Sequence, residues 1–111
     1  MSKFITVTSD DLTFEIFTSA RVPLLYKKKF GIGMLKDAES LVMDAEKSVW
    51  LIHQSYLAKC IVMGEKQEIT EDKILDFIPA VELMKTSFTL IQSFTKEIEG
   101  LSPKDEVEKK T

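Results

Sequence analysis

The sequence contains few of the residues that crosslink a chain or bind a metal. Among its 111 residues there is one cysteine, Cys60, and one histidine, His53. A single cysteine excludes an intrachain disulfide, and one histidine with one cysteine leaves a zinc site at least two ligands short of its usual four. The first residues also lack the charged and then apolar segments of a secretory signal. We therefore expect a chain that folds in a reducing cytoplasm, with no metal and no cofactor.

A long apolar run and an excess of positive charge are missing as well. The most apolar stretch, residues 49–63, is shorter than a usual membrane span and is interrupted by polar residues such as Lys59. The net charge of −3 argues against general binding to nucleic acids or anionic membranes, because such binding requires surplus Lys and Arg. The composition instead favours proteins as partners, with no membrane contact.

Motifs for catalysis are scarce. Gly31-Ile32-Gly33 is not followed by Lys-Ser or Lys-Thr, so it does not match a phosphate-binding loop. Cys60 follows His53 at a spacing that places both on one face of a helix, and a Cys–His pair can form an activated thiolate. Their neighbours on this face, Val49 and Ile52, are apolar, and apolar surroundings make a thiol inert. We favour core packing for Cys60 and expect that the protein is not an enzyme. A thiol enzyme that uses Cys60 and His53 stays open as an alternative function.

The chain has the length of one domain, which we place at residues 1–100, and a domain of this size buries roughly 65% of its unfolded surface. Within it, residues 3–18 alternate between apolar and polar side chains, which predicts a two-stranded hairpin with its turn at Ser9-Asp10-Asp11. Such a hairpin must pack on the helices or pair with another chain, and its free edge is a candidate assembly surface. The apolar positions are Ile5, Val7, Leu12, Phe14 and Ile16, and the polar positions are Thr6, Thr8, Thr13 and Glu15.

Helical patterns begin after the hairpin. The first helix should start at an N-cap provided by Thr18 or Ser19 and end at Gly31, which suits the left-handed position after a helix. Three lysines, residues 27–29, fall in its last turn, where cations oppose the negative end of the helix dipole. A second helix is expected to begin at Met34.

The third predicted helix, residues 48–63, is apolar on nearly all sides, a pattern typical of a helix at the centre of a core. Gly64 should end it. Thr70 is a good N-cap for a short fourth helix, and Pro79 either starts a new helix or kinks the old one.

The last helix, residues 81–98, has the clearest amphipathic pattern. Its predicted apolar face consists of Val81, Met84, Phe88, Ile91, Phe94, Thr95 and Ile98. Gly100 should end this helix, and residues 101–111 should form a flexible charged tail, because they cannot bury enough apolar surface to become ordered. The predicted fold class is therefore mainly α with a small N-terminal β-hairpin (α+β), in a compact bundle of about four to five helices.

The first predicted helix carries the sequence Leu24-Leu25-Tyr26-Lys27-Lys28-Lys29-Phe30-Gly31. This segment resembles the LLYKKxFGxDxL signature of tail assembly chaperones from long-tailed bacteriophages and prophages, mainly those of Gram-positive hosts. The likeness extends over roughly residues 1–100, as a short β opening, an apolar helix around Trp50 to Ala58 and a final helical section. Gly33 departs from the signature, since members often have Asp at this position.

The resemblance implies a function without catalysis. Members of this family are thought to coat the tape measure protein until tail tube subunits polymerise around it, and they are absent from the mature virion. Many are made in a short form and in a longer form produced by ribosomal frameshifting, and this chain would match the short form. The resemblance thus implies the tape measure protein, the tail tube protein, a longer frameshifted form and further copies of this chain as partners, in the host bacterial cytoplasm.

Partner-binding candidates come from the first and last helices. They are Leu25, Tyr26, Lys28, Phe30, Phe88, Ile91 and Phe94. The aromatic members could serve either an interface or the core. An alternative function is a small dimeric nucleic-acid-binding regulatory protein, which would dimerise through the last helix and bind phosphates through Arg21 and residues 27–29.

Overall fold

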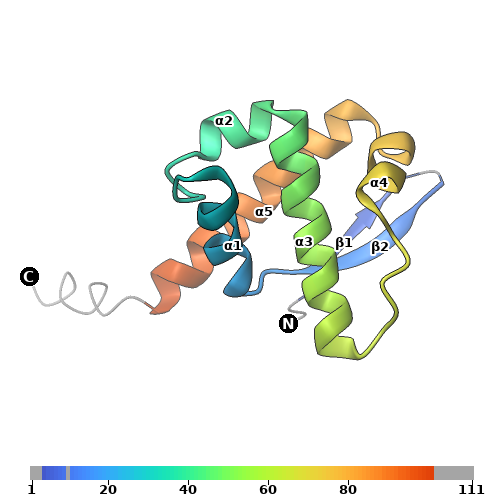
Figure 1. Ribbon diagram of the computed structural model, residues 1–111, viewed down its shortest axis with the longest axis horizontal. Helices are drawn as coiled ribbons and strands as arrows, with labels where there is room; N and C mark the ends of the chain where they lie inside the picture. The colour runs from blue at the N-terminus through green and yellow to red at the C-terminus, as the bar shows by residue number, and fades with distance from the viewer. Residues whose placement is uncertain (1–3, 10, 102–111) are drawn as a thin grey trace, which may run out of the picture.

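Two strands and five helices make up the part of the chain that the structure describes, which is residues 4–9 and 11–101, with side chains through Lys96 (Figure 1). In this computed structural model the elements are β1 (Phe4–Thr8), β2 (Thr13–Phe17), α1 (Arg21–Phe30), α2 (Ala38–Met43), α3 (Ala45–Met63), α4 (Glu71–Phe77) and α5 (Ala80–Leu101). The predicted fold class, mainly helical with an N-terminal hairpin, is confirmed.

The hairpin is antiparallel, with Val7 opposite Phe14 and Ile5 opposite Ile16. Directly opposed residues point to the same side of a sheet, so this register gathers the apolar side chains of both strands on one face. That face lies against α3, while the polar residues of both strands are exposed, as the alternation predicts. The backbone N–H of Ser9 donates to the Leu12 carbonyl oxygen over 2.8 Å and closes the turn.

Helix α3 occupies the centre of the domain, as its sequence predicts. It packs against β2, α5, α2, α1 and α4. Figure 1 shows α1 and α2 beside it on one side, the hairpin and α4 on the other, and α5 crossing behind. Five consecutive residues, Ser48 to Ile52, are buried, which is the pattern of a helix covered on several faces. α3 begins at Ala45, earlier than the sequence pattern indicated, because Asp44 Oδ1 caps it by accepting the Lys47 backbone N–H over 3.1 Å.

Several predicted helix ends are confirmed. Gly31 and Gly64 end α1 and α3 with φ angles of 80° and 68°, the left-handed conformation that glycine adopts without steric cost. Thr70 Oγ1 caps α4 by accepting the Lys73 backbone N–H over 3.2 Å. Pro79 separates α4 from α5, so of its two predicted roles it starts a new helix.

Three predicted boundaries were wrong. The N-cap of α1 is Ala20 rather than Thr18 or Ser19. Ser19 lies one residue before this N-cap, and its hydroxyl accepts the backbone N–H of Arg21. Residues 34–37 form turns instead of the first turn of the predicted second helix, and the backbone N–H of Asp37 donates to the Gly33 carbonyl oxygen. α2 therefore begins only at Ala38. At the other end, α5 continues to Leu101, through the glycine expected to end it. The predicted tail beyond Leu101 lies outside the described residues.

The predicted apolar face of α5 was also only partly correct. The side that packs into the core carries Leu83, Ser87, Leu90, Ile91 and Phe94. By contrast, the first three members of the predicted face are exposed: Val81, Met84 and Phe88. α5 therefore has two adjacent apolar stripes, and the core covers only one of them along the first half of the helix. Sequence periodicity alone does not distinguish them, because either stripe could have faced α3.

Candidate functional site

The motif helix α1 places its signature residues in different environments. Tyr26 is completely buried, Leu25 and Phe30 are half-buried, and Lys28 is exposed. The rings of Tyr26 and Phe30 both pack on Trp50 of α3, with centroid distances of 5.6 Å and 5.5 Å. Tyr26 and Phe30 therefore attach α1 to the core, and of these four residues Lys28 is the most accessible to a partner.

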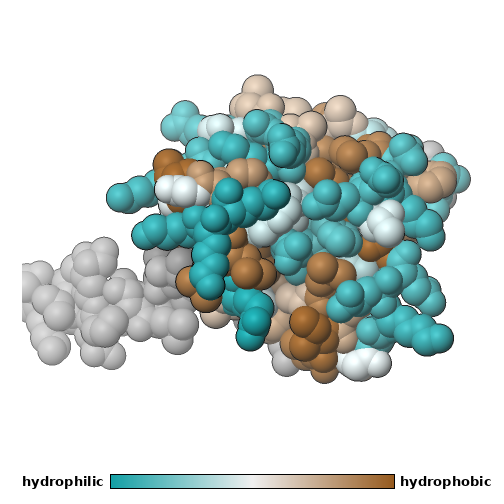
Figure 2. All heavy atoms as spheres, in the orientation of Figure 1, coloured by the Kyte–Doolittle hydropathy of each residue, from teal (hydrophilic) through white to brown (hydrophobic). Residues whose placement is uncertain are grey.

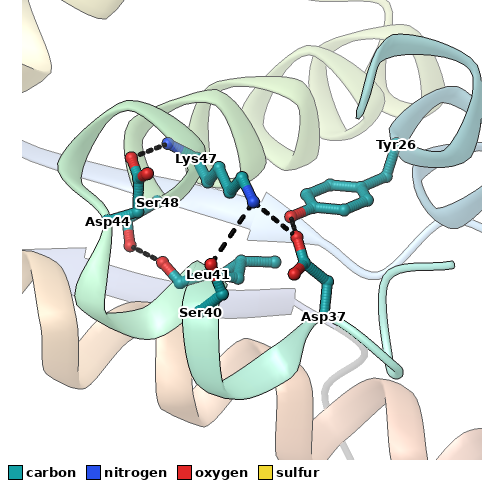
Figure 3. A network of polar contacts seen from close by, with 7 residues as sticks. All are labelled: Tyr26, Asp37, Ser40, Leu41, Asp44, Lys47 and Ser48. Carbon is teal, nitrogen blue, oxygen red and sulfur yellow. Dashed lines mark hydrogen bonds and ion pairs between the residues drawn. The ribbon is translucent and has the colours of Figure 1, made fainter. Parts of the chain in front are cut away.

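A polar network joins α1 to the loop before α2 and to the start of α3 (Figure 3). Tyr26 Oη donates to Asp37 Oδ2 over 2.5 Å, and Lys47 Nζ donates to the same oxygen over 2.8 Å. Lys47 Nζ also lies 3.4 Å from Ser40 Oγ on α2. In Figure 3 the side chains of Tyr26 and Lys47 approach Asp37 from different helices. This carboxylate thus connects three segments that are separate in sequence.

The electrostatics of this network follow from its geometry. The hydrogen bond from Lys47, with a second one from Tyr26, lowers the pKa of Asp37 below its ordinary value. Burial and the adjacent Asp37 carboxylate raise the pKa of the Tyr26 hydroxyl. Asp37 is therefore ionised and Tyr26 neutral around pH 7. No sequence pattern indicates Asp37 and Lys47 as partners, because their pairing depends on the turn that residues 31–37 take.

Polar contacts also fix the connector between α3 and α4. Tyr56 Oη accepts the backbone N–H groups of Glu68 and Ile69 over 2.9 Å and 3.2 Å. Lys59 forms an ion pair with Glu65, which raises the pKa of the lysine. These residues border a hollow of about 430 Å³ between the hairpin and the connector. The contacts hold the connector against α3.

The Cys60 and His53 side chains contact this same connector. Cys60 is buried, and its Sγ lies 3.6 Å from the Lys66 carbonyl oxygen. His53 Nε2 lies 2.9 Å from the Ile69 carbonyl oxygen. Both residues thus have packing roles that account for their presence on α3. Among the described residues, no cluster of three His, Cys, Asp or Glu side chains is arranged to hold a metal ion.

An apolar groove lies between α2 and α5 and has a volume of about 360 Å³. Its lining consists of Ala38, Glu39, Val42, Met43, Phe88 and Ile91. Met43 is 74% exposed and Phe88 is 53% exposed, although both side chains are large and apolar. Of the partner candidates on α5, Phe88 is thus accessible, whereas Ile91 lines the groove but is buried, and Phe94 is buried in the core. Met43 was not among the predicted partner-binding residues.

A second, smaller apolar cleft of about 150 Å³ lies between α1 and α3. Leu25 lines it together with Leu57, Ala58 and Ile61. Next to it, the last turn of α3 exposes the apolar residues 61–63. Figure 2 shows apolar side chains gathered over this lower end of α3. These two apolar surfaces have no lining residue in common, and of the two only the α1–α3 cleft includes residues of the motif helix.

The fold defines a mainly helical domain with an N-terminal β-hairpin, and none of its described helices is long and apolar enough to cross a bilayer. No protein-family model, curated protein or solved structure matches the chain. The likeness of residues 24–31 to the signature of phage tail assembly chaperones stays a resemblance.

Proposed function

We propose that this protein is a phage or prophage tail assembly chaperone. It binds the tape measure protein, keeps it soluble and helps to recruit tail tube subunits in the host cytoplasm, without catalysis, and is not retained in the mature virion. The motif of residues 24–31 and the order of the elements support this proposal.

The observation that carries the proposal is the amount of apolar surface that the domain exposes. Twelve large hydrophobic residues of the described chain are at least 36% exposed, and several gather beside the α2–α5 groove and at the end of α3. Contiguous exposed apolar surface on a small domain is typical of a protein that binds other proteins. Several small patches, each binding weakly, also suit a chaperone that must leave when the tail tube forms, since many weak contacts hold a long client reversibly.

The other partners follow from the same role. The tail tube protein displaces the chaperone, and a longer frameshifted form and further copies of this chain take part in assembly. The described sheet has only two strands, so β1 and β2 each have one side that is not paired within it. Such an edge can accept a strand from another chain.

A coexpression pull-down tests the proposal. The tagged chain is expressed with the long helical protein encoded just downstream of its gene, and the soluble fraction is compared with that of the client expressed alone. A soluble complex is expected. Phe88→Asp should weaken it, whereas Thr89→Asp, the adjacent exposed position, should not, and circular dichroism verifies the fold of both variants. A client that aggregates equally with and without the chain would exclude this function.

The charge of α1 favours a second candidate function. Arg21 and residues 27–29 are exposed basic side chains on a helix of ten residues that has no acidic residue. Nucleic-acid binding through this helix predicts an affinity that falls steeply with salt, and replacing residues 27–29 with glutamine should reduce the salt dependence. Salt-independent or undetectable binding to duplex DNA would exclude it.

A further inference from the structure

The α2–α5 groove has the chemistry of a docking site for one particular kind of helix. Phe88 lines the groove on α5, and the exposed residues Val81 and Met84 continue its stripe toward the start of the helix, over about two turns or roughly 10 Å. Met43 lines the groove on α2. Grooves between helices with exposed methionine and aromatic side chains accept the apolar face of an amphipathic helix, because methionine adapts to differently shaped side chains.

The two walls of the groove differ in charge. On the α2 side, Glu39 lines the groove, and Lys47, which reaches α2 at Ser40, is paired with Asp37. On the α5 side, the lining residues Phe88 and Ile91 carry no charge, and Lys85, one turn before Phe88, lies 3.8 Å from Glu82, so its charge is partly compensated. A helix in the groove therefore meets the carboxylate of Glu39 on the α2 wall.

We propose that the α2–α5 groove binds an amphipathic helix whose apolar ridge is flanked by Lys or Arg on the side that faces α2. Such a flank complements the carboxylate of Glu39, whereas an acidic flank would be repelled. This inference rests on the proposed function for the identity of the client, and it specifies which segments of a long helical client the chaperone selects: those with a basic border.

Peptide binding to the purified full chain tests this selection. One fluorescent 20-residue helical peptide carries leucines at spacings of three and four residues with lysines along one flank, and its twin carries glutamates in place of the lysines. In fluorescence anisotropy the lysine peptide should bind at least about tenfold more tightly than the glutamate peptide. Equal binding of the two peptides would overturn the proposed selectivity.

Substitutions of exposed residues locate the site without disturbing the core. Met43→Ser and Phe88→Ser should each weaken binding of the lysine peptide by about fivefold or more, because each removes apolar contact area from the groove. Leu75→Ser, at an exposed apolar position on α4, should leave the affinity unchanged. Glu39→Lys should narrow or reverse the preference between the two peptides. Loss of binding in Leu75→Ser alone, or an unchanged preference in Glu39→Lys, would contradict the assignment.

Two further measurements separate this inference from its alternatives. If light scattering shows that the free chain is a dimer that Phe88→Ser converts to a monomer, the groove is occupied by a second copy and the proposal is wrong. If Phe88→Ser loses the peptide but still binds the tape measure protein like the wild type, the groove is not the client site, although the chaperone function stands. If the wild type binds the lysine peptide but no tape measure protein, the groove assignment holds and the proposed function fails.

Discussion

Removing the hydroxyl of Tyr26 should destabilise the fold by roughly 1.5–2 kcal/mol, the lower part of the range for a hydrogen bond to a charged group. The ring is fully buried and packs on Phe30 and Trp50, so Tyr26→Phe leaves these contacts in place and deletes only the 2.5 Å hydrogen bond to Asp37. The loss should not reach the top of the range, because Lys47 still pairs with the carboxylate. Urea unfolding followed by circular dichroism measures the change, which for a chain of this size corresponds to a fall in Tm of roughly 6–10 °C.

The matched control is Lys28→Gln, at an exposed position two residues further along the same helix. It should change the free energy of unfolding by less than about 0.5 kcal/mol. A double-mutant cycle of Tyr26→Phe with Lys47→Met should show coupling, because both side chains donate to one oxygen of Asp37. A loss below about 0.5 kcal/mol for Tyr26→Phe would refute the view that this signature tyrosine acts through its hydroxyl.

Further predictions concern pH, a helix end, the two sides of α5 and the thiol. The pKa of Asp37 is lower in the folded chain than in the unfolded chain. The contribution of Asp37 to stability should therefore be complete above about pH 4 and decline as the pH falls through the pKa of the folded chain. Asp37→Asn should flatten this decline, measured as the urea midpoint at a series of acidic pH values. Gly64→Ala should cost about 1 kcal/mol through its positive φ alone, since no atom lies within 4 Å of the added methyl group, and a larger loss would reveal a packing role. Leu90→Ala should lower the free energy of unfolding by about 2–5 kcal/mol, whereas Phe88→Ala, on the exposed side of α5, should lower it by less than about 1 kcal/mol. Similar losses for both variants, measured by thermal or urea unfolding, would show that the Phe88 side of α5 is not exposed. Cys60 should react with iodoacetamide far more slowly in the folded chain than in urea, because it is buried, and rapid alkylation of the native chain would revive the thiol-enzyme alternative.

The residues of the motif 24–31 fall into two groups in the structure, one packed on the core and one accessible to a partner. Tyr26 and Phe30 hold α1 and the following loop on the core through Trp50 and Asp37. A partner can contact the exposed members, Leu24 and residues 27–29, and the half-buried Leu25. Part of this motif thus serves folding, and substitutions of Tyr26 would alter the binding of any partner only through the fold.

Local features of the sequence determined the type of each element and several of its ends. Alternation in residues 3–18 defined the hairpin, and the nearly continuous apolar character of residues 48–63 defined the central helix. Gly31, Gly64 and Thr70 marked helix boundaries, because the left-handed conformation and the N-cap hydroxyl are properties of single residues.

Only the tertiary structure decided how the helices face one another and which polar groups meet. α5 carries two apolar stripes, and contact with α3 selected the one that includes Leu90 and left Phe88 exposed. The pairing of Tyr26, Asp37 and Lys47 likewise depends on the turns of residues 31–37, which no periodic pattern encodes. The groove between α2 and α5 also depends on the tertiary structure. It forms where the two helices meet and where the core leaves an apolar stripe of α5 uncovered. Periodicity reports which residues share a face of a helix, but the neighbour that covers the face is set by the rest of the fold.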